Sequence, residues 1–205
     1  MTSRAILIAA ALAAALSPAA VYAEAADPGA AQIEAFNAAL LDAMKQGKTL
    51  GVNGRYRKLA PAVEAAFDLP TMTRFAVGPK WASVAPADQA ALIKAFSRMT
   101  IASYAKNFDD YGGERFAVDA NVQTRGPDKL VKSHIIPKAD KPTDLIFRMR
   151  QASDGKWKVI DVYYQGSISE LTTRRSDFAA AMNSGGAPAL LKKIDALADK
   201  LMAGG

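Results

Sequence analysis

The chain has 205 residues and a formal net charge of +6, and it contains one histidine and no cysteine. The lack of cysteine excludes a disulfide framework, thiol chemistry and cysteine-ligated metals. A modest positive charge favours anionic surfaces such as lipid headgroups, but the basic residues are scattered along the chain, so nucleic acid is not an expected partner.

Residues 1–23 have the layout of a secretory signal peptide. Arg4 precedes an apolar run from Ala5 to Leu16, and small residues follow up to Ala23. This layout predicts cleavage after Ala23 or two residues later. A retained membrane anchor is the alternative, although the run is shorter than the ~20 residues that span a bilayer. We therefore expect a signal peptide over residues 1–23, a single domain over residues 24–205 and an exported protein.

Two helices are expected at the front of the mature chain. Apolar residues recur at helical spacing from Asp27 to Gln46, and Gly47 is expected to end this first helix. A second helix is expected from Arg55 to Phe67, and Pro61 should start or kink it, because proline lacks the N–H that a helix interior needs. The segment Phe67–Val84 should form a short helical turn and a loop.

A long helix is expected from Pro86 to about Tyr111, because proline is favoured at a first helical position and Gly112–Gly113 follow as an end signal. Its apolar face is wider than a surface helix needs. The helix is therefore either deeply buried or faces the core on one side and another apolar surface on the other. The residues of this face are Leu92, Ile93, Phe96, Met99, Thr100, Ser103, Tyr104 and Phe108.

Four strands are predicted to follow, over Phe116–Arg125, Leu130–Pro137, Asp144–Ala152 and Trp157–Gln165. Turn signals separate them, which indicates an antiparallel meander. The third strand alternates apolar residues with Arg148 and Arg150, so one of its faces is apolar. The fourth is apolar on both faces and should lie centrally or be covered on both sides. Two helices, Ile168–Asn183 and Pro188–Met202, should end the chain, which makes the whole an α+β domain.

Few residues offer catalytic or metal-binding chemistry. His134 is the single histidine, and its neighbour Ser133 points to the opposite face of a strand, so the two cannot form a nucleophile–base pair. Asp161 is the strongest acid–base candidate because it alternates with apolar residues, and a structural carboxylate bonded to backbone N–H groups or to an arginine is the alternative. With one histidine and no cysteine, we expect no metal and no other cofactor.

An ordered series of residues resembles the MlaC-type periplasmic lipid-binding proteins, also called the toluene-tolerance group. The resemblance covers roughly residues 30–200, and the segments "FAVGPKW", "NFDDYGGERF" and "RRSDF" are most similar to the hopanoid-associated HpnM branch. Gln165 departs from the usual acidic residue before Gly166, and "GSIS" is one residue longer than the common form. The matching residues are Phe67, Asp68, Met72, Arg74, Gly78, Trp81, Gln89, Phe96, Tyr104, Trp157, Asp161, Gly166 and Phe178.

The resemblance implies an NTF2-like fold, in which helices cover a curved four-stranded antiparallel sheet and enclose an apolar cavity. It implies a periplasmic carrier, not an enzyme, that moves a hopanoid or a phospholipid between an inner-membrane transporter complex and an outer-membrane or second membrane complex. The protein is expected to act as a monomer.

Helix phase and strand alternation select the residues expected to bind the lipid. The segment Phe67–Val84 is expected to form a wall or the lip of the cavity, and Arg174–Arg175 are candidates for an anionic headgroup or an acidic partner, or simply a solvated helix face. Two other readings remain open: an enzyme that uses Asp161 or His134 as general base, and an accessory protein whose interior is filled by side chains. The expected lipid-binding residues are Phe75, Val77, Trp81, Leu92, Phe96, Met99, Tyr104, Val118, Phe147, Met149, Val162 and Tyr164.

Overall fold

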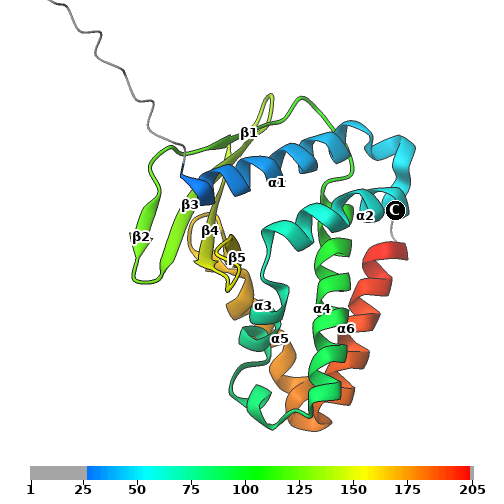
Figure 1. The fold of residues 1–205 in the computed structure, drawn as a ribbon. Coiled ribbons are helices and arrows are strands. Elements are labelled where there is room, and N and C mark those ends of the chain that lie inside the picture. The colour runs from blue at the N-terminus through cyan, green and yellow to red at the C-terminus, as the bar shows by residue number, and fades with distance from the viewer. Residues whose placement is uncertain (1–26, 204–205) are drawn as a thin grey trace, which may run out of the picture.

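The structure is a computed structural model that describes residues 27–203, so the expected signal peptide lies outside the described residues. Helices precede and follow an antiparallel sheet, which confirms the α+β class (Figure 1). None of the helices in this part of the chain is long and apolar enough to cross a membrane. The elements are α1 (Pro28–Lys45), α2 (Gly47–Ala66), α3 (Leu69–Val77), the 3-10 helix η1 (Gly78–Ser83), α4 (Pro86–Asn107), β1 (Arg115–Val118), β2 (Gln123–Arg125), β3 (Asp128–Ile136), β4 (Thr143–Gln151), β5 (Trp157–Tyr164), β6 (Ile168–Ser169), α5 (Glu170–Ser184) and α6 (Gly186–Ala203).

The sheet has the order β1-β3-β4-β5-β6, and β2 also pairs with β3. It therefore has six strands rather than the four expected from the sequence. The expected strand Phe116–Arg125 is split into two strands. Val118 pairs with Ser133 and Gln123 pairs with Leu130, so four residues separate the paired positions on this side and only two separate them on β3. The excess residues leave the ladder and divide the strand into β1 and β2.

The inner face of the sheet carries the core. Helix α1 packs against β1, β3 and β5 (Figure 1). Its Phe36 ring contacts the rings of Phe67 and Tyr104, both at 5.1 Å between centroids, and Phe147 of β4 at 6.3 Å. Edge-to-face contacts of this kind are favourable between aromatic rings. The core thus joins α1, the end of α2, α4 and the sheet around one aromatic cluster.

Strand alternation on β4 is as expected. Phe147 and Met149 are buried on the inner face, whereas Arg148 and Arg150 bind Asp128 on the outer face. Burial by itself would raise the pKa of Asp128, but hydrogen bonds from Arg150 and Arg148 outweigh it and hold the pKa below its ordinary value. The outer face is thus held by charge and the inner face by apolar packing.

Two helix boundaries differ from expectation. Helix α2 begins at Gly47, with a break in helical geometry at Gly51, and Pro61 lies inside it. A side chain at Gly47 would meet the carbonyl oxygen of Asp109 at 1.9 Å, so only glycine permits this close approach of the chain after α4. Helix α4 ends at Asn107 rather than near Tyr111, and the chain turns away to reach α2.

The segment Phe67–Val84 and the start of α5 also differ from expectation. The segment Phe67–Val84 is more helical than expected, because Asp68 caps a nine-residue helix α3 that Gly78 ends with a φ of 75°. The helix expected from Ile168 begins at Glu170, because Ile168 and Ser169 pair with Tyr164 and Tyr163 as β6. Ser169 then caps α5 by accepting the N–H of Thr172 at 3.0 Å.

Candidate functional site

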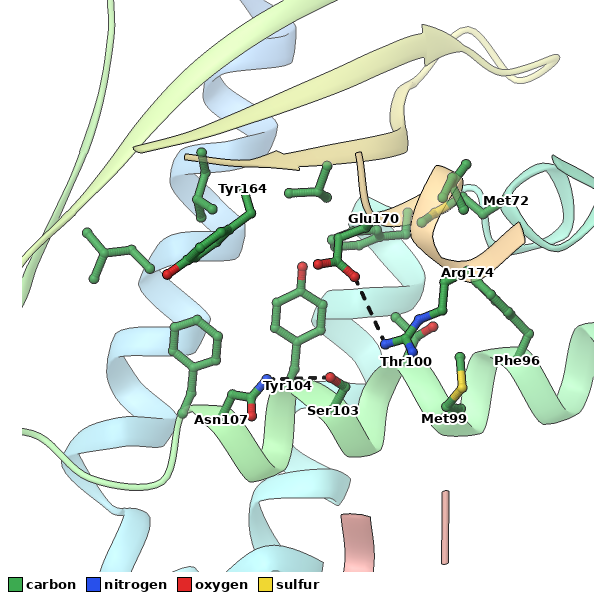
Figure 2. A pocket seen from close by; sticks show the side chains of 16 residues that line it. Met72, Phe96, Met99, Thr100, Ser103, Tyr104, Asn107, Tyr164, Glu170 and Arg174 are labelled. Atoms are coloured by element: carbon green, nitrogen blue, oxygen red, sulfur yellow. Dashed lines mark hydrogen bonds and ion pairs between the residues drawn. The ribbon is translucent and has the colours of Figure 1, made fainter. Parts of the chain in front are cut away.

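A cavity of about 350 Å³ lies between the inner face of the sheet, α4 and the first turns of α5 (Figure 2). It reaches the surface beside Asn107, Tyr164 and Glu170, which are exposed. The interior is therefore not filled by side chains, contrary to the reading of the chain as an accessory protein with a packed interior.

The sheet supplies an apolar wall. Leu145 and Tyr164 pair across β4 and β5, and Val162 pairs with the core residue Phe147 one step along the same face. Ile135 of β3 completes this wall. Because side chains alternate between the faces of a sheet, the register places all four toward the cavity.

Helix α4 supplies a mixed wall. Phe96 and Met99 line the cavity with a polar row formed by Thr100, Ser103 and Asn107. The spacing of three and four residues places this row on one line of the helix. Asn107 Nδ2 lies 3.5 Å from Ser103 Oγ, as Figure 2 shows. The cavity therefore offers hydroxyl and amide groups next to apolar surface.

Aromatic rings line the cavity from the α2–α3 junction to the end of α4. Phe67 lies 5.6 Å from Tyr104, and Tyr104 stacks on Phe108 at 5.8 Å between ring centroids. Met72 of α3 also lines the cavity. The segment Phe67–Val84 thus contributes Phe67 and Met72 to the cavity wall.

A polar corner lies at the start of α5, where Glu170, Leu171 and Arg174 line the cavity. Arg174 Nη2 lies 4.0 Å from Glu170 Oε2 and Arg174 Nη1 lies 3.9 Å from Asp177 Oδ2. Burial raises the pKa of the Tyr104 phenol above its usual value, and the charge of Glu170 acts in the same direction. Tyr104 is therefore a neutral hydroxyl that points toward a carboxylate (Figure 2).

The structure brings five of the twelve expected lipid-binding residues to the cavity, namely Phe96, Met99, Tyr104, Val162 and Tyr164. The other seven lie elsewhere, and a lipid-binding role for any of the twelve stays a prediction. Four of the seven are buried in the core and three are partly buried against it. The four are Val77, Leu92, Phe147 and Met149, and the three are Phe75, Trp81 and Val118.

The cavity also contains residues that the sequence analysis did not select as lipid-binding. Thr100, Ser103 and Phe108 were on the broad face of the long helix, so helix phase had indicated them. No sequence pattern indicated Glu170 as a cavity residue, because its position at the cavity depends on where α5 begins. Phe67 and Met72 belong to the segment expected to form a wall or the lip of the cavity, and Arg174 was a candidate for a headgroup or a partner. The others are Asn107, Ile135, Leu145 and Leu171.

The two arginines that follow β6 have different surroundings. Arg175 donates from Nε and Nη2 to the carbonyl oxygen of Phe75, at 2.9 and 2.7 Å. This contact ties α5 to α3. Arg174 lines the cavity instead.

Asp161 does not line the cavity and its contacts are structural. Its side chain accepts the N–H groups of Val162 at 2.8 Å and Leu171 at 3.2 Å, and the hydroxyl of Ser169 at 2.7 Å. It therefore fixes the end of β5 to the start of α5. Of the two readings of Asp161, an acid–base group or a structural carboxylate bonded to backbone N–H groups, these contacts fit the second.

We expect Asp161→Ala to lower the free energy of unfolding by about 2–3 kcal/mol, because two buried N–H groups lose their acceptor. Asp161→Asn keeps an oxygen for both N–H groups and should cost about 1 kcal/mol or less. Urea denaturation of the two variants measures the difference. If both variants lost the same free energy of unfolding, the charge of Asp161 rather than its hydrogen bonds to the two N–H groups would stabilise the fold.

His134 lies on the outer face of the sheet, away from the cavity. Its Nδ1 lies 2.8 Å from Asp144 Oδ1 and its Nε2 lies 3.0 Å from Asp119 Oδ1. Hydrogen bonds to Asp144 and then Asp119 raise the pKa of His134 above its ordinary value. Within residues 27–203, no group of three or more histidine, cysteine, aspartate or glutamate residues is placed to hold a metal ion.

This pKa shift predicts a pH-dependent stability. Because the folded-state pKa is raised, the stabilisation is complete below the unfolded pKa of about 6.5 and is lost as the pH rises through the folded value. We expect His134→Gln to destabilise the protein by up to about 1 kcal/mol at roughly pH 5.5 and to have a smaller effect at roughly pH 8.5. Urea denaturation at both pH values tests this, and a loss independent of pH would contradict the assignment.

The chain is similar to proteins of one known family. The family model described as MlaC protein matches residues 34–196. The fold is similar to that of the phospholipid-binding protein from Ralstonia solanacearum, solved in complex with a phospholipid, with a TM-score of 0.73. The two sequences are 20% identical, and the alignment covers 84% of this chain and 98% of that one. None of the curated proteins compared with the chain matches it.

Proposed function

The chain belongs to the MlaC protein family, and we propose that it is a periplasmic lipid carrier. In this proposal the apolar part of the ligand lies in the cavity between the sheet and α4. The observation that carries the proposal is the cavity itself, which is open to the surface at one end and lined mainly by apolar side chains. The phospholipid-binding protein with a similar fold supports a lipid as the ligand.

The proposed mechanism is physical transfer rather than catalysis. Each CH₂ group that moves from water into the cavity contributes about 0.8 kcal/mol, so enclosing part of an acyl chain or of a hopane skeleton offsets much of the cost of leaving a bilayer. The contacts of Asp161 and His134 support this proposal over an enzyme, because both side chains bind neighbouring residues outside the cavity.

The size of the cavity bears on the ligand. At about 350 Å³ it is near the lower end of the range of roughly 300–1,000 Å³ typical of ligand pockets. We propose that a phospholipid or a hopanoid is the ligand, that it enters with part of its apolar body, and that side chains or α5 shift to admit the rest. The segments similar to the HpnM branch favour a hopanoid, whereas the structural neighbour favours a phospholipid.

We further propose that the protein acts as a monomer between an inner-membrane transporter complex and an outer-membrane or second membrane complex. A transfer assay tests the carrier role. Donor vesicles contain a labelled lipid, acceptor vesicles contain none, and protein freed of its lipid is added. A rate of transfer that rises with protein concentration supports the proposal, and a rate equal to that without protein would contradict it.

A further inference from the structure

Two opposite charges lie side by side on the cavity wall. Glu170 and Arg174 stand one turn apart on α5, and both line the cavity (Figure 2). Their closest charged atoms are 4.0 Å apart, which is too long for a hydrogen bond. Their side chains are 49% and 27% exposed. Asp177 Oδ2 lies 3.9 Å from Arg174 Nη1, which is also too long for a hydrogen bond, so Glu170 and Arg174 each keep hydrogen-bonding capacity that their charged neighbours do not use.

The surroundings of the two charges differ. On the side of Glu170 lie the ring of Tyr104 and, beyond it, Tyr164 (Figure 2). The Tyr104 hydroxyl points toward the Glu170 carboxylate (Figure 2), and two oxygen acceptors side by side suit an ammonium group. Thr100 of α4, whose hydroxyl is a further donor, lines the same cavity as Arg174 of α5. An arginine and a hydroxyl that line one cavity suit a phosphate.

A ligand head with a single charge does not match this corner. An anionic head that pairs with Arg174 is repelled by Glu170, because the two groups are about one ion-pair distance apart. A head that carries a phosphate and an ammonium a few ångströms apart finds a partner for each charge. The polar corner is therefore complementary to a zwitterion.

Resting on the proposed function, we propose that Glu170 and Arg174 form a headgroup site that selects zwitterionic phospholipids. Arg174 binds the phosphate with Thr100, and Glu170 binds the ammonium beside Tyr104. The apolar part of the lipid lies against Phe96, Met99 and the inner face of the sheet. Phosphatidylethanolamine and phosphatidylcholine have heads of this kind.

Competition among lipids with identical acyl chains tests the site. Protein freed of its lipid is offered phosphatidylethanolamine, phosphatidylglycerol and diacylglycerol together, and native mass spectrometry measures which it binds. We expect the zwitterionic lipid to be bound about tenfold more than phosphatidylglycerol, which is the effect of one additional ion pair. Its preference over diacylglycerol should be larger, because diacylglycerol forms neither ion pair.

Two variants assign the effect to the two charges. Glu170→Gln should shift the preference toward phosphatidylglycerol by about tenfold, because the repulsion of the anionic head is removed. Arg174→Gln should weaken binding of both phosphate-bearing lipids and leave diacylglycerol unchanged. Glu34→Gln and Arg57→Gln are matched controls, because both residues are exposed and outside the cavity, and they should leave the preference unchanged. Thermal unfolding confirms that all four variants are folded.

The outcomes separate the two proposals. Equal binding of the three lipids, a preference for the anionic or uncharged lipid, or a preference that neither variant alters would overturn the headgroup site while leaving the carrier role intact. Failure to bind any of the three lipids, with a folded protein, would overturn the headgroup site, and failure to bind a hopanoid as well would overturn the carrier role.

Discussion

Replacing Ser103 by tryptophan should lower the lipid content of the protein at least about tenfold, because the indole fills space that the ligand needs. Ser103 lies near the C-terminal end of α4 and lines the cavity together with Tyr104 and Arg174. The new ring enters empty volume of about 350 Å³, so the overpacking that normally accompanies such a change is avoided. The fold should therefore survive while the site is blocked.

Ser97→Trp is the matched control for this prediction. Ser97 lies on the same helix but lines a separate outer groove of about 580 Å³, beside Glu64 and Lys158. This substitution adds the same ring to the same helix and should leave lipid binding unchanged. Lipid extraction from both purified variants measures the effect. A Ser103→Trp protein that is folded and carries as much lipid as the control would mean that the ligand does not occupy this cavity.

Replacing Arg55 by methionine should lower the free energy of unfolding by about 2–4 kcal/mol, because two buried carbonyl groups lose their donor. Arg55 is 4% exposed, and it donates from Nε to the carbonyl oxygen of Ala105 and from Nη1 to that of Gly47, each at 2.7 Å. It thereby satisfies the last turn of α4 and joins it to the start of α2. Methionine retains an apolar stem but no donor.

Arg57→Met provides the comparison, because Arg57 lies two residues further along α2 and is exposed. It should change stability by no more than about 0.5 kcal/mol. Urea denaturation of both variants gives the two values. If the Arg55 variant were no less stable than the Arg57 variant, the two carbonyl contacts would not stabilise the fold.

Much of the fold is predictable because it follows from local periodicity. The turn signals and the alternation on β4 indicated an antiparallel sheet, and the helical spacing located α1, α4 and α6 closely. The start of α2 at Gly47 was not predictable, because it depends on the approach of Asp109 from a distant part of the chain. The division of one expected strand into β1 and β2, and the two-residue strand β6, likewise depend on pairing with neighbours rather than on composition.

The cavity was less predictable than the fold. Helix phase identified the face of α4 that lines it, but alternation alone does not separate a residue facing the cavity from one in the core. Val162 and Phe147 are paired on the same face of the sheet, yet Val162 lines the cavity and Phe147 is core. The difference arises from where α1 covers the sheet and where α5 begins. Glu170 was therefore visible in the sequence only as part of an expected helix, whereas Arg174 was already one of two arginines considered for a headgroup or an acidic partner.

The measurement that tests the central claim most directly is native mass spectrometry, with organic extraction, of the protein purified from the periplasm of its own host. We expect one lipid molecule for each protein chain. A diacyl phospholipid would identify the ligand class that the headgroup site requires, and a hopanoid would support the narrower family branch and count against that site. A folded protein that is empty, and that stays empty when offered both lipids, would contradict the carrier function.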